Sequence, residues 1–230
     1  MIQDPKSEIS EAYLTVRANL AFSTVQGVPK TMMVTSSRPA EGKSTTSFAL
    51  ASVLARTGNR VVLIDADMRS PSIHTIFDLP NEVGFSSYLT GASDPKELLR
   101  ETGIPNLWLI SAGRTPPSAA ELLSSEKPHE LLTVLLESFD HVVIDAPPLL
   151  GLADSPLLAR SVEAVVYVVE TNGVPTRGIK VSLDRLQESQ ANIVGAVMTK
   201  FISQRDGTYG YGYGYGYGYG LSYGKNTEDA

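Results

Sequence analysis

The tetrapeptide Gly-Lys-Ser-Thr at 42–45 contains the residue types that most clearly point to chemistry in this chain. An apolar stretch at 32–34 precedes it, and a segment with a helical pattern at 47–56 follows it. This is the layout of a phosphate-binding P-loop, in which backbone N–H groups and the positive end of a helix face one anion. The first glycine of the pattern G-x-x-x-x-G-K-[ST] would fall at Ser37, so an ordinary helix start is the alternative. The flanking strand and helix favour a nucleotide site.

Each residue of this loop has an expected part in binding a nucleotide with Mg²⁺. Gly42 allows the backbone to approach a phosphate, and Lys43 would reach the β- and γ-phosphates. The hydroxyl of Ser44 would hold Mg²⁺. Glu41 and Thr45 flank these three residues and complete the set that we expect to contact the nucleotide.

Two further apolar runs end in carboxylates. The run 61–64 is followed by Asp65 and Asp67, and the run 142–144 is followed by Asp145 and two prolines. Because sites in open α/β sheets form at the carboxyl ends of the strands, we expect these acids beside the P-loop. Carboxylates at this edge can bind Mg²⁺ or accept a proton, and Asp145 would act on Mg²⁺ or its water shell. The alternative is an ordinary strand-end turn, where aspartate is common.

The elements that must position these residues alternate between strand and helix along the chain. This alternation predicts an α/β fold, a P-loop NTPase-like parallel sheet with helices on both faces and right-handed crossovers. An amphipathic helix over 7–25, with Ser7 as N-cap, is expected to pack on its own domain or to contact another subunit. The other expected elements are helices over 72–77, 86–89, 95–100, 119–123, 128–138, 152–162 and 176–189, and strands over 106–111, 164–169 and 192–198.

The composition argues against several other classes of function. The net charge of −6 and the lack of a basic run argue against nucleic acid as a partner. The sequence contains no signal peptide and no apolar run near the ~18 residues that a membrane span needs. A chain without cysteine forms no disulfide and has no thiolate chemistry, which fits a cytosolic protein. The three histidines (His74, His129 and His141) lack metal-ligand spacing and are interpreted as structural or surface residues.

The C-terminal segment differs in character from the rest of the chain. We divide the chain into a domain over 1–203, which has ample length for a core, and a tail over 204–230. Glycine at every second position makes ordering of the tail costly in entropy, so disorder is predicted, with an edge strand or self-association as alternatives. Beside a nucleotide site, its hydroxyls are candidate phosphoryl acceptors. The candidate acceptors are Tyr209, Tyr211, Tyr213, Tyr215, Tyr217, Tyr219 and Tyr223.

Taken together, these motifs resemble those of the bacterial tyrosine kinases of capsule and exopolysaccharide synthesis, often called BY-kinases. The segment 36–45 is similar to their Walker A motif, Asp65-Ala66-Asp67-Met68-Arg69 to their D-x-D-x-R motif, and 144–148 to their Walker B motif. The segments 84–91 and 116–123 also recur in that family, and a C-terminal tyrosine cluster is its hallmark. The resemblance covers about residues 8–200 and the tail.

The resemblance implies a cytoplasmic kinase, recruited to the inner face of the plasma membrane, that uses Mg-ATP to phosphorylate its own tail tyrosines. It implies regulation of polysaccharide export, activation by a membrane polysaccharide co-polymerase, a homo-oligomer and a tyrosine phosphatase as partner. It assigns Lys43 to the phosphates, and Ser44, Asp67 and Asp145 to the metal. It assigns Asp65 to activation of the tyrosine hydroxyl. A phenol with a pKa of about 10 is only ~0.1% ionised at pH 7, so a proton acceptor would help.

The sequence departs from the family pattern at two places. The first helix of the family often carries E-x-x-R-x-x-R, used for ring assembly, and here Glu11 and Arg17 match but Leu14 replaces the central arginine. The loss of a bidentate charge pair leaves ring formation open. Thr199 and Lys200 stand where related ATPases often carry an asparagine for adenine.

Two other functions remain open from the sequence. The first is a switch ATPase of the plasmid-partition or septum-positioning type. Such proteins usually have a second lysine early in the P-loop, where this chain has Arg38, and usually lack a tyrosine tail. The second is a non-catalytic, nucleotide-sensing partner.

Overall fold

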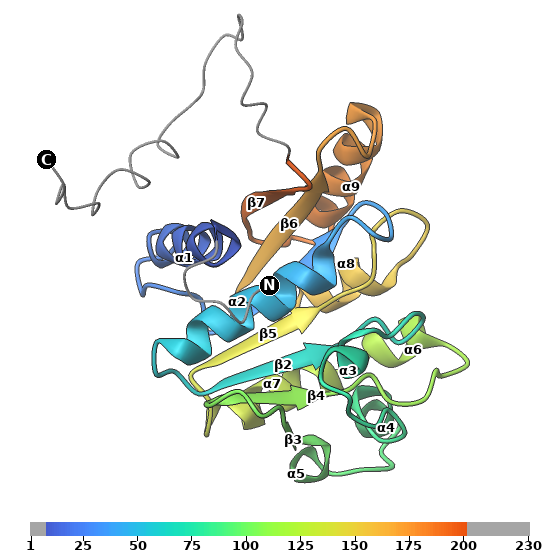
Figure 1. Ribbon diagram of the computed structural model, residues 1–230. Coiled ribbons are helices and arrows are strands. Elements are labelled where there is room, and N and C mark those ends of the chain that lie inside the picture. Colours follow the sequence, from blue (N-terminus) through green and yellow to red (C-terminus); the bar gives the residue numbers. More distant parts are fainter. Residues whose placement is uncertain (1–7, 202–230) are drawn as a thin grey trace, which may run out of the picture.

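A computed structural model describes residues 8–201 and builds them around one sheet (Figure 1). Within those residues, seven strands lie in the order β3-β4-β2-β5-β1-β6-β7, and every pair is parallel except β3 with β4. The predicted fold class, a P-loop NTPase-like parallel sheet with helices on both faces, is confirmed. The strands are β1 (Thr31–Ser36), β2 (Val61–Asp65), β3 (Arg100–Glu101), β4 (Leu107–Ile110), β5 (His141–Asp145), β6 (Ala164–Glu170) and β7 (Ile193–Thr199).

Helices cover both faces of this sheet. The helices α1 and α2 lie on one face, and α7, α8 and α9 lie on the other (Figure 1). The helices are α1 (Glu8–Ala21), α2 (Lys43–Arg56), α3 (Ile73–Ile76), α4 (Phe85–Leu89), α5 (Pro95–Leu98), α6 (Ala119–Leu123), α7 (Lys127–Leu136), α8 (Asp154–Ala159) and α9 (Thr176–Glu188). Among the described residues, no helix is both long and apolar enough to cross a membrane.

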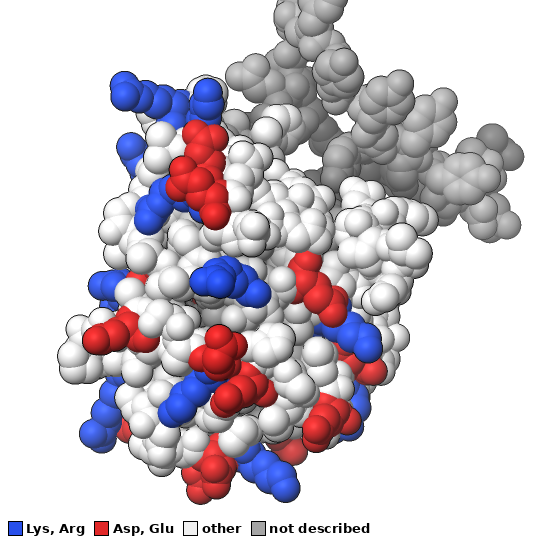
Figure 2. Space-filling view, turned by 180° about the vertical axis from the view of Figure 1, so that it is seen from behind, with Lys and Arg blue, Asp and Glu red and all other residues white. Residues whose placement is uncertain are grey.

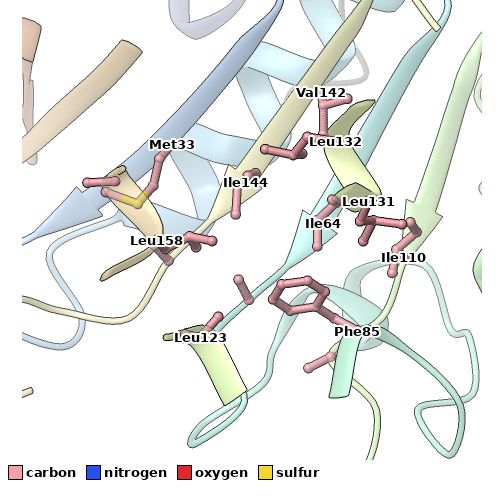
Figure 3. Close-up of a cluster of buried hydrophobic side chains, with 14 of the residues drawn as sticks. Met33, Ile64, Phe85, Ile110, Leu123, Leu131, Leu132, Val142, Ile144 and Leu158 are labelled. Atoms are coloured by element: carbon pink, nitrogen blue, oxygen red, sulfur yellow. The ribbon is translucent and has the colours of Figure 1, made fainter. Parts of the chain in front are cut away.

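The central strands form because their side chains find an apolar layer on both sides. All residues of β1, β2 and β5 are buried, and alternate residues point to opposite faces. On one face, Met33, Ile64 and Ile144 pack against Leu131 of α7 and Leu158 of α8 (Figure 3). Each such fully buried side chain stabilises the fold by about 1.5–3 kcal/mol.

Many element boundaries differ from the sequence prediction by up to three residues; for example, the helix predicted over 152–162 is Asp154–Ala159 and the one predicted over 128–138 is Lys127–Leu136. Three other differences are larger or change the type of element. The first helix ends at Ala21, four residues before the predicted end, and turns lead to Gly27, which has a φ of 92°. The helix after the P-loop begins at Lys43 and not at residue 47. Residues 100–101, of which residue 100 was assigned to a helix, form the antiparallel edge strand β3 because the chain turns extended at Leu99. Ser7, the tail and the proposed 203/204 boundary lie outside the described residues.

The carboxyl ends of the parallel strands meet at one edge of the sheet. Asp65 at the end of β2 lies in register with Asp145 at the end of β5, and Asp145 lies in register with Val34 of β1. The last strand, β7, is parallel to β6, and β6 is parallel to β1, as predicted. The chain therefore leaves β7 at the edge that carries the acids and the P-loop.

Candidate nucleotide-binding active site

The loop between β1 and α2 requires glycine at position 42 for two reasons. Gly42 has a φ of 94°, a region that side chains other than glycine rarely adopt. A Cβ at this position would also lie 3.1 Å from Cγ2 of Thr199, at the end of β7. The carbonyl of Gly42 accepts the backbone N–H of Thr46 at 2.9 Å, so α2 starts immediately after the loop.

Ser37, at the position of the first P-loop glycine, has a structural role of its own. The φ of Ser37 is not in the left-handed region, so glycine is not needed at this position. In the same loop the left-handed conformation is adopted by Ala40, whose φ is 65°. The buried hydroxyl of Ser37 forms hydrogen bonds with the hydroxyl of Tyr167 in β6 and, at 2.8 Å, with that of Ser182 in α9. The imperfect motif therefore still fits the loop, because the backbone at position 37 does not require glycine.

Lys43 lies at the centre of the predicted site. Its Nζ is 2.8 Å from Oδ2 of Asp67 and 3.6 Å from Oδ2 of Asp145. It donates to Oγ of Ser44 at 3.3 Å, and that oxygen accepts from the hydroxyl of Ser72 at 3.2 Å. Burial lowers the pKa of Lys43, but the nearby carboxylates outweigh that effect and raise it. Lys43 is therefore a protonated cation that meets all three predicted metal ligands.

Asp145 carries an oxygen that lacks a hydrogen-bond partner. Its Oδ1 accepts from the hydroxyl of Ser47 at 3.0 Å. Within residues 8–201, its fully buried Oδ2 accepts no hydrogen bond. Burial raises the pKa of Asp145, and the charge of Lys43 opposes this shift. A buried carboxylate oxygen that has an ion pair with Lys43 but accepts no hydrogen bond, beside Asp67 and the Ser44 hydroxyl, fits Mg²⁺, which typically binds one or two carboxylates and fills its shell with water and phosphate.

Asp65 is held more tightly than the other two acids. Its Oδ2 accepts the backbone N–H groups of Ser72 and Ile73, each at 3.0 Å, and its Oδ1 accepts that of Asp67 at 3.2 Å. It is fully buried. Burial, followed by the charge of Asp145, raises the pKa of Asp65 to about 7. A carboxylate with such a pKa can both hold and release a proton near neutral pH.

Comparison with known proteins identifies the family. A family model described as AAA domain matches residues 30–197. The tyrosine-protein kinase YwqD of Bacillus subtilis (strain 168) is 36% identical over 208 residues, which cover 90% of this chain and 88% of the relative. The putative tyrosine-protein kinase CapB of Staphylococcus aureus is 35% identical over 207 residues, which cover 90% and 91%. This chain belongs to the bacterial tyrosine kinases of capsule and exopolysaccharide synthesis.

Solved structures agree with this assignment. The kinase domain of the Escherichia coli tyrosine kinase ETK has a TM-score of 0.85 at 30% identity and covers 93% of this chain and 84% of that chain. The chimerical protein CapA2B2 has a TM-score of 0.81 at 33% identity and covers 85% and 86%. The septum site-determining protein MinD of Pyrococcus horikoshii, complexed with Mg-ADP, has a TM-score of 0.62 at 19% identity and covers 74% and 69%. At that identity MinD shows a shared fold only, and the protein with that fold is complexed with Mg-ADP.

The remaining predicted nucleotide contacts of the kinase differ in exposure. Thr45 is exposed on the first turn of α2. Glu41 is buried, and its carboxylate accepts the backbone N–H groups of Arg38 at 2.5 Å and Glu170 at 3.5 Å. The side chain of Glu41 therefore binds backbone groups of the protein, and only the backbone of Glu41 is left to contact a phosphate. The predicted acceptor tyrosines lie outside the described residues.

Several residues that contribute to the site were not predicted from the sequence. Asp154, at the start of α8, accepts a bidentate pair of hydrogen bonds from Arg69 at 2.7 and 3.0 Å. This pair ties the loop after β2 to the helix that follows β5. The only sequence signal is an aspartate near the predicted start of a helix, and no spacing connects it with Arg69. Of the histidines, His141 bonds the carbonyl of Pro29 through Nδ1 at 2.9 Å.

Proposed function

We propose that this kinase binds ATP with Mg²⁺ at the edge formed by β1, β2 and β5 and transfers the γ-phosphoryl group to tyrosines of its own tail. The observation that carries the proposal is the cluster at Lys43, whose Nζ lies within 3.6 Å of Asp67, Asp145 and Ser44. The proposed acceptors are the tyrosines at positions 209, 211, 213, 215, 217, 219 and 223.

Each side chain at this edge has a defined task in the transfer. Bound Mg-ATP would supply the phosphoryl group and an ion that offsets its negative charge. The Ser44 hydroxyl and the carboxylates of Asp67 and Asp145 would hold the ion. Lys43 would stabilise charge on the transferred group, since phosphoryl transfer depends mainly on positioning and electrostatics.

Asp65 is the proposed acceptor of the tyrosine proton. Its pKa of about 7 supports this role, because a general base works best when its pKa lies near the working pH. Its three backbone N–H donors occupy three of the about four lone-pair positions of a carboxylate, which leaves one position on Oδ1 for a phenol. We therefore expect Asp65→Asn to reduce transfer more than ATP binding. Equal losses would make Asp65 a structural residue or a metal ligand.

The central test is Lys43→Met, incubated with Mg-ATP and followed by an anti-phosphotyrosine blot and a phosphate-release assay. We expect a folded protein without tail phosphorylation, whereas Lys30→Met, an exposed lysine just before β1, should behave as wild type. Unchanged phosphotyrosine in folded Lys43→Met would overturn the proposal. Phosphate release by wild type without phosphotyrosine would indicate a switch ATPase, and nucleotide binding without either product would indicate a sensor.

The partners of the kinase follow from its family and are part of the proposal. We propose a cytoplasmic location at the inner face of the plasma membrane, where a separate membrane co-polymerase activates the kinase and a tyrosine phosphatase reverses its action. Support for a separate partner comes from two similar proteins. One is the chimerical protein CapA2B2, and the other is the putative tyrosine-protein kinase CapB. We also propose a homo-oligomer. Whether it forms a ring is undecided, because Leu14 replaces the central arginine of the family motif. Weak tail phosphorylation by the purified chain alone is expected, and full cellular stoichiometry without a partner would contradict it.

A further inference from the structure

The ends of β6 and β7 hold the P-loop through a set of contacts that the transfer reaction does not use. Thr199, the last residue of β7, donates its hydroxyl proton to the carbonyl of Glu41 at 2.6 Å. The Glu41 carboxylate accepts from the backbone N–H of Glu170, the last residue of β6, at 3.5 Å. Lys200 then pairs with the carboxylate of Glu170 at 2.8 Å.

Thr199 is also packed against the residue that precedes the catalytic lysine. Its Cγ2 lies 3.1 Å from the position that a Cβ on Gly42 would occupy. A hydroxyl has one proton, and here that proton faces two carbonyls, that of Glu41 at 2.6 Å and that of Val169 at 3.4 Å, so Thr199 retains only acceptor capacity toward a nucleobase. The hydroxyl of Thr199 therefore holds the loop, and its methyl group lies where a side chain at position 42 would have to go.

The same residue is fixed to the rest of the sheet and lies near the start of the tail. The carbonyl of Thr199 accepts both the backbone N–H and the hydroxyl of Thr171, each at 3.0 Å. The chain continues from Thr199 through Lys200 and Phe201 into the tyrosine-rich tail. We call residues 199–201, which lead into the tail, the root of the tail. Contacts between the P-loop and the end of β7 therefore connect the proposed nucleotide site with the root of the tail.

We propose that Thr199 is a positioning residue that couples the P-loop to the root of the tail. It sets the geometry of Glu41 and Gly42, and hence the affinity for ATP, without touching the transferred group. Because coupling between two sites is reciprocal, nucleotide binding in turn stabilises residues 199–201. This inference rests on the proposed nucleotide function.

The test uses Thr199→Val, which keeps the shape but removes the donor, and Thr199→Ser, which keeps the donor. The matched control is Thr133→Val, which removes an exposed hydroxyl bond to a backbone carbonyl in α7. In the full-length chain, Thr199→Val should raise the Kd for Mg-ATP roughly three- to tenfold and raise KM without lowering kcat at saturating ATP. Thr199→Ser should stay within about twofold of wild type, and the control should not change.

A second readout does not depend on activity. Hydrogen exchange of residues 199–201 should slow when Mg-ATP is added to wild type, and should respond less in Thr199→Val. Wild-type affinity in Thr199→Val, or equal losses in the valine and serine variants, would overturn the coupling. If Thr199→Val does not fold, Thr171→Val is measured in its place, because it removes the hydroxyl bond to the carbonyl of Thr199. An unchanged Kd for Mg-ATP in Thr171→Val would also overturn the coupling. Failure of wild type to bind ATP would refute the proposed function itself.

Discussion

At the scale of single residues, the proposed active site carries an excess of buried negative charge. Lys43 faces Asp65, Asp67 and Asp145, so ionisation of all three carboxylates leaves two more negative charges than Lys43 balances. Burial raises the pKa of both Asp65 and Asp145 because a charged carboxylate loses hydration there. A divalent cation would remove this imbalance, which is why the electrostatics favour a metal at this edge.

The raised pKa of Asp65 predicts a pH-dependent stability. An unfolded aspartate has a pKa of about 3.9, whereas Asp65 in the folded chain has a pKa of about 7. The folded state thus binds this proton more tightly, and the resulting stability is full below about pH 4 and is lost as the pH rises through about 7. In urea unfolding without nucleotide or Mg²⁺, wild type should lose more stability between pH 5 and pH 8 than Asp65→Asn does.

A matched control for this experiment is Asp140→Asn. Asp140 is an exposed carboxylate that also accepts a backbone N–H, from Arg60 at 2.7 Å. This variant controls for the loss of one carboxylate and one backbone hydrogen bond outside the Lys43 cluster. Identical slopes for wild type and Asp65→Asn would show that Asp65 is ionised over the whole range.

The residues that the sequence predicted at the site are those whose position follows from strand ends. Lys43, Asp65, Asp67 and Asp145 each follow an apolar run, and parallel strands bring such positions together. Partners that depend on contacts between distant segments could not be predicted in this way. Thr199 with Glu41 is one such pair.

At the scale of elements, buried strands were predictable and element ends were not. The strands β1, β2 and β5 are covered on both faces, so each contains an unbroken apolar run, at 32–34, 61–64 and 142–144. The strand β3 has two residues and no repeat from which to recognise it. The helix α2 starts early because it begins directly after the P-loop turn at Gly42. The spacing of apolar residues in the sequence does not reveal this turn.

Two glycines with the same backbone conformation separate strain from steric conflict at the P-loop. Gly42 and Gly58 have φ values of 94° and 92°, but only a Cβ at Gly42 meets another residue, because nothing lies within 4 Å at Gly58. Gly42→Ala and Gly58→Ala should each lose about 1 kcal/mol of stability from the backbone alone. Gly42→Ala should in addition weaken ATP binding more than tenfold, measured as Kd by titration. Equal ATP affinities would show that the loop shape tolerates the methyl group.

At the scale of the whole molecule, the arrangement of the sheet determines what the tail can reach. The end of β7 lies at the same edge as Lys43 and the acids, as follows from the predicted parallel sheet. A glycine-rich chain spans about 5–6 Å times the square root of its length, so tyrosines ~10–25 residues beyond β7 typically reach about 16–30 Å. That reach includes the site of a neighbour and does not exclude the chain's own, so geometry alone does not choose between them.

A mixing experiment decides between the two routes of transfer. Lys43→Met protein with an intact tail is combined with active protein truncated after Ser203. Since the family resemblance favours transfer between subunits, we expect label on the intact tail. Unlabelled tails in the mixture, together with labelled tails in full-length wild type, would establish transfer within one chain.

Tail phosphorylation should also change the assembly state through charge. On the face shown in Figure 2, acidic and basic side chains are interspersed, and the chain as a whole has a net charge of −6. Each phosphate adds about −1.5 to −2 charges, so seven phosphotyrosines would add roughly −10 to −14. Like charge at this density repels neighbouring subunits and should disperse an oligomer.

We therefore expect light scattering to give an associated form before ATP and a monomer after heavy tail phosphorylation. The form truncated after Ser203 should keep its mass under ATP, because it lacks the acceptors. An unchanged mass of the full-length chain despite full phosphorylation would rule out charge as the switch.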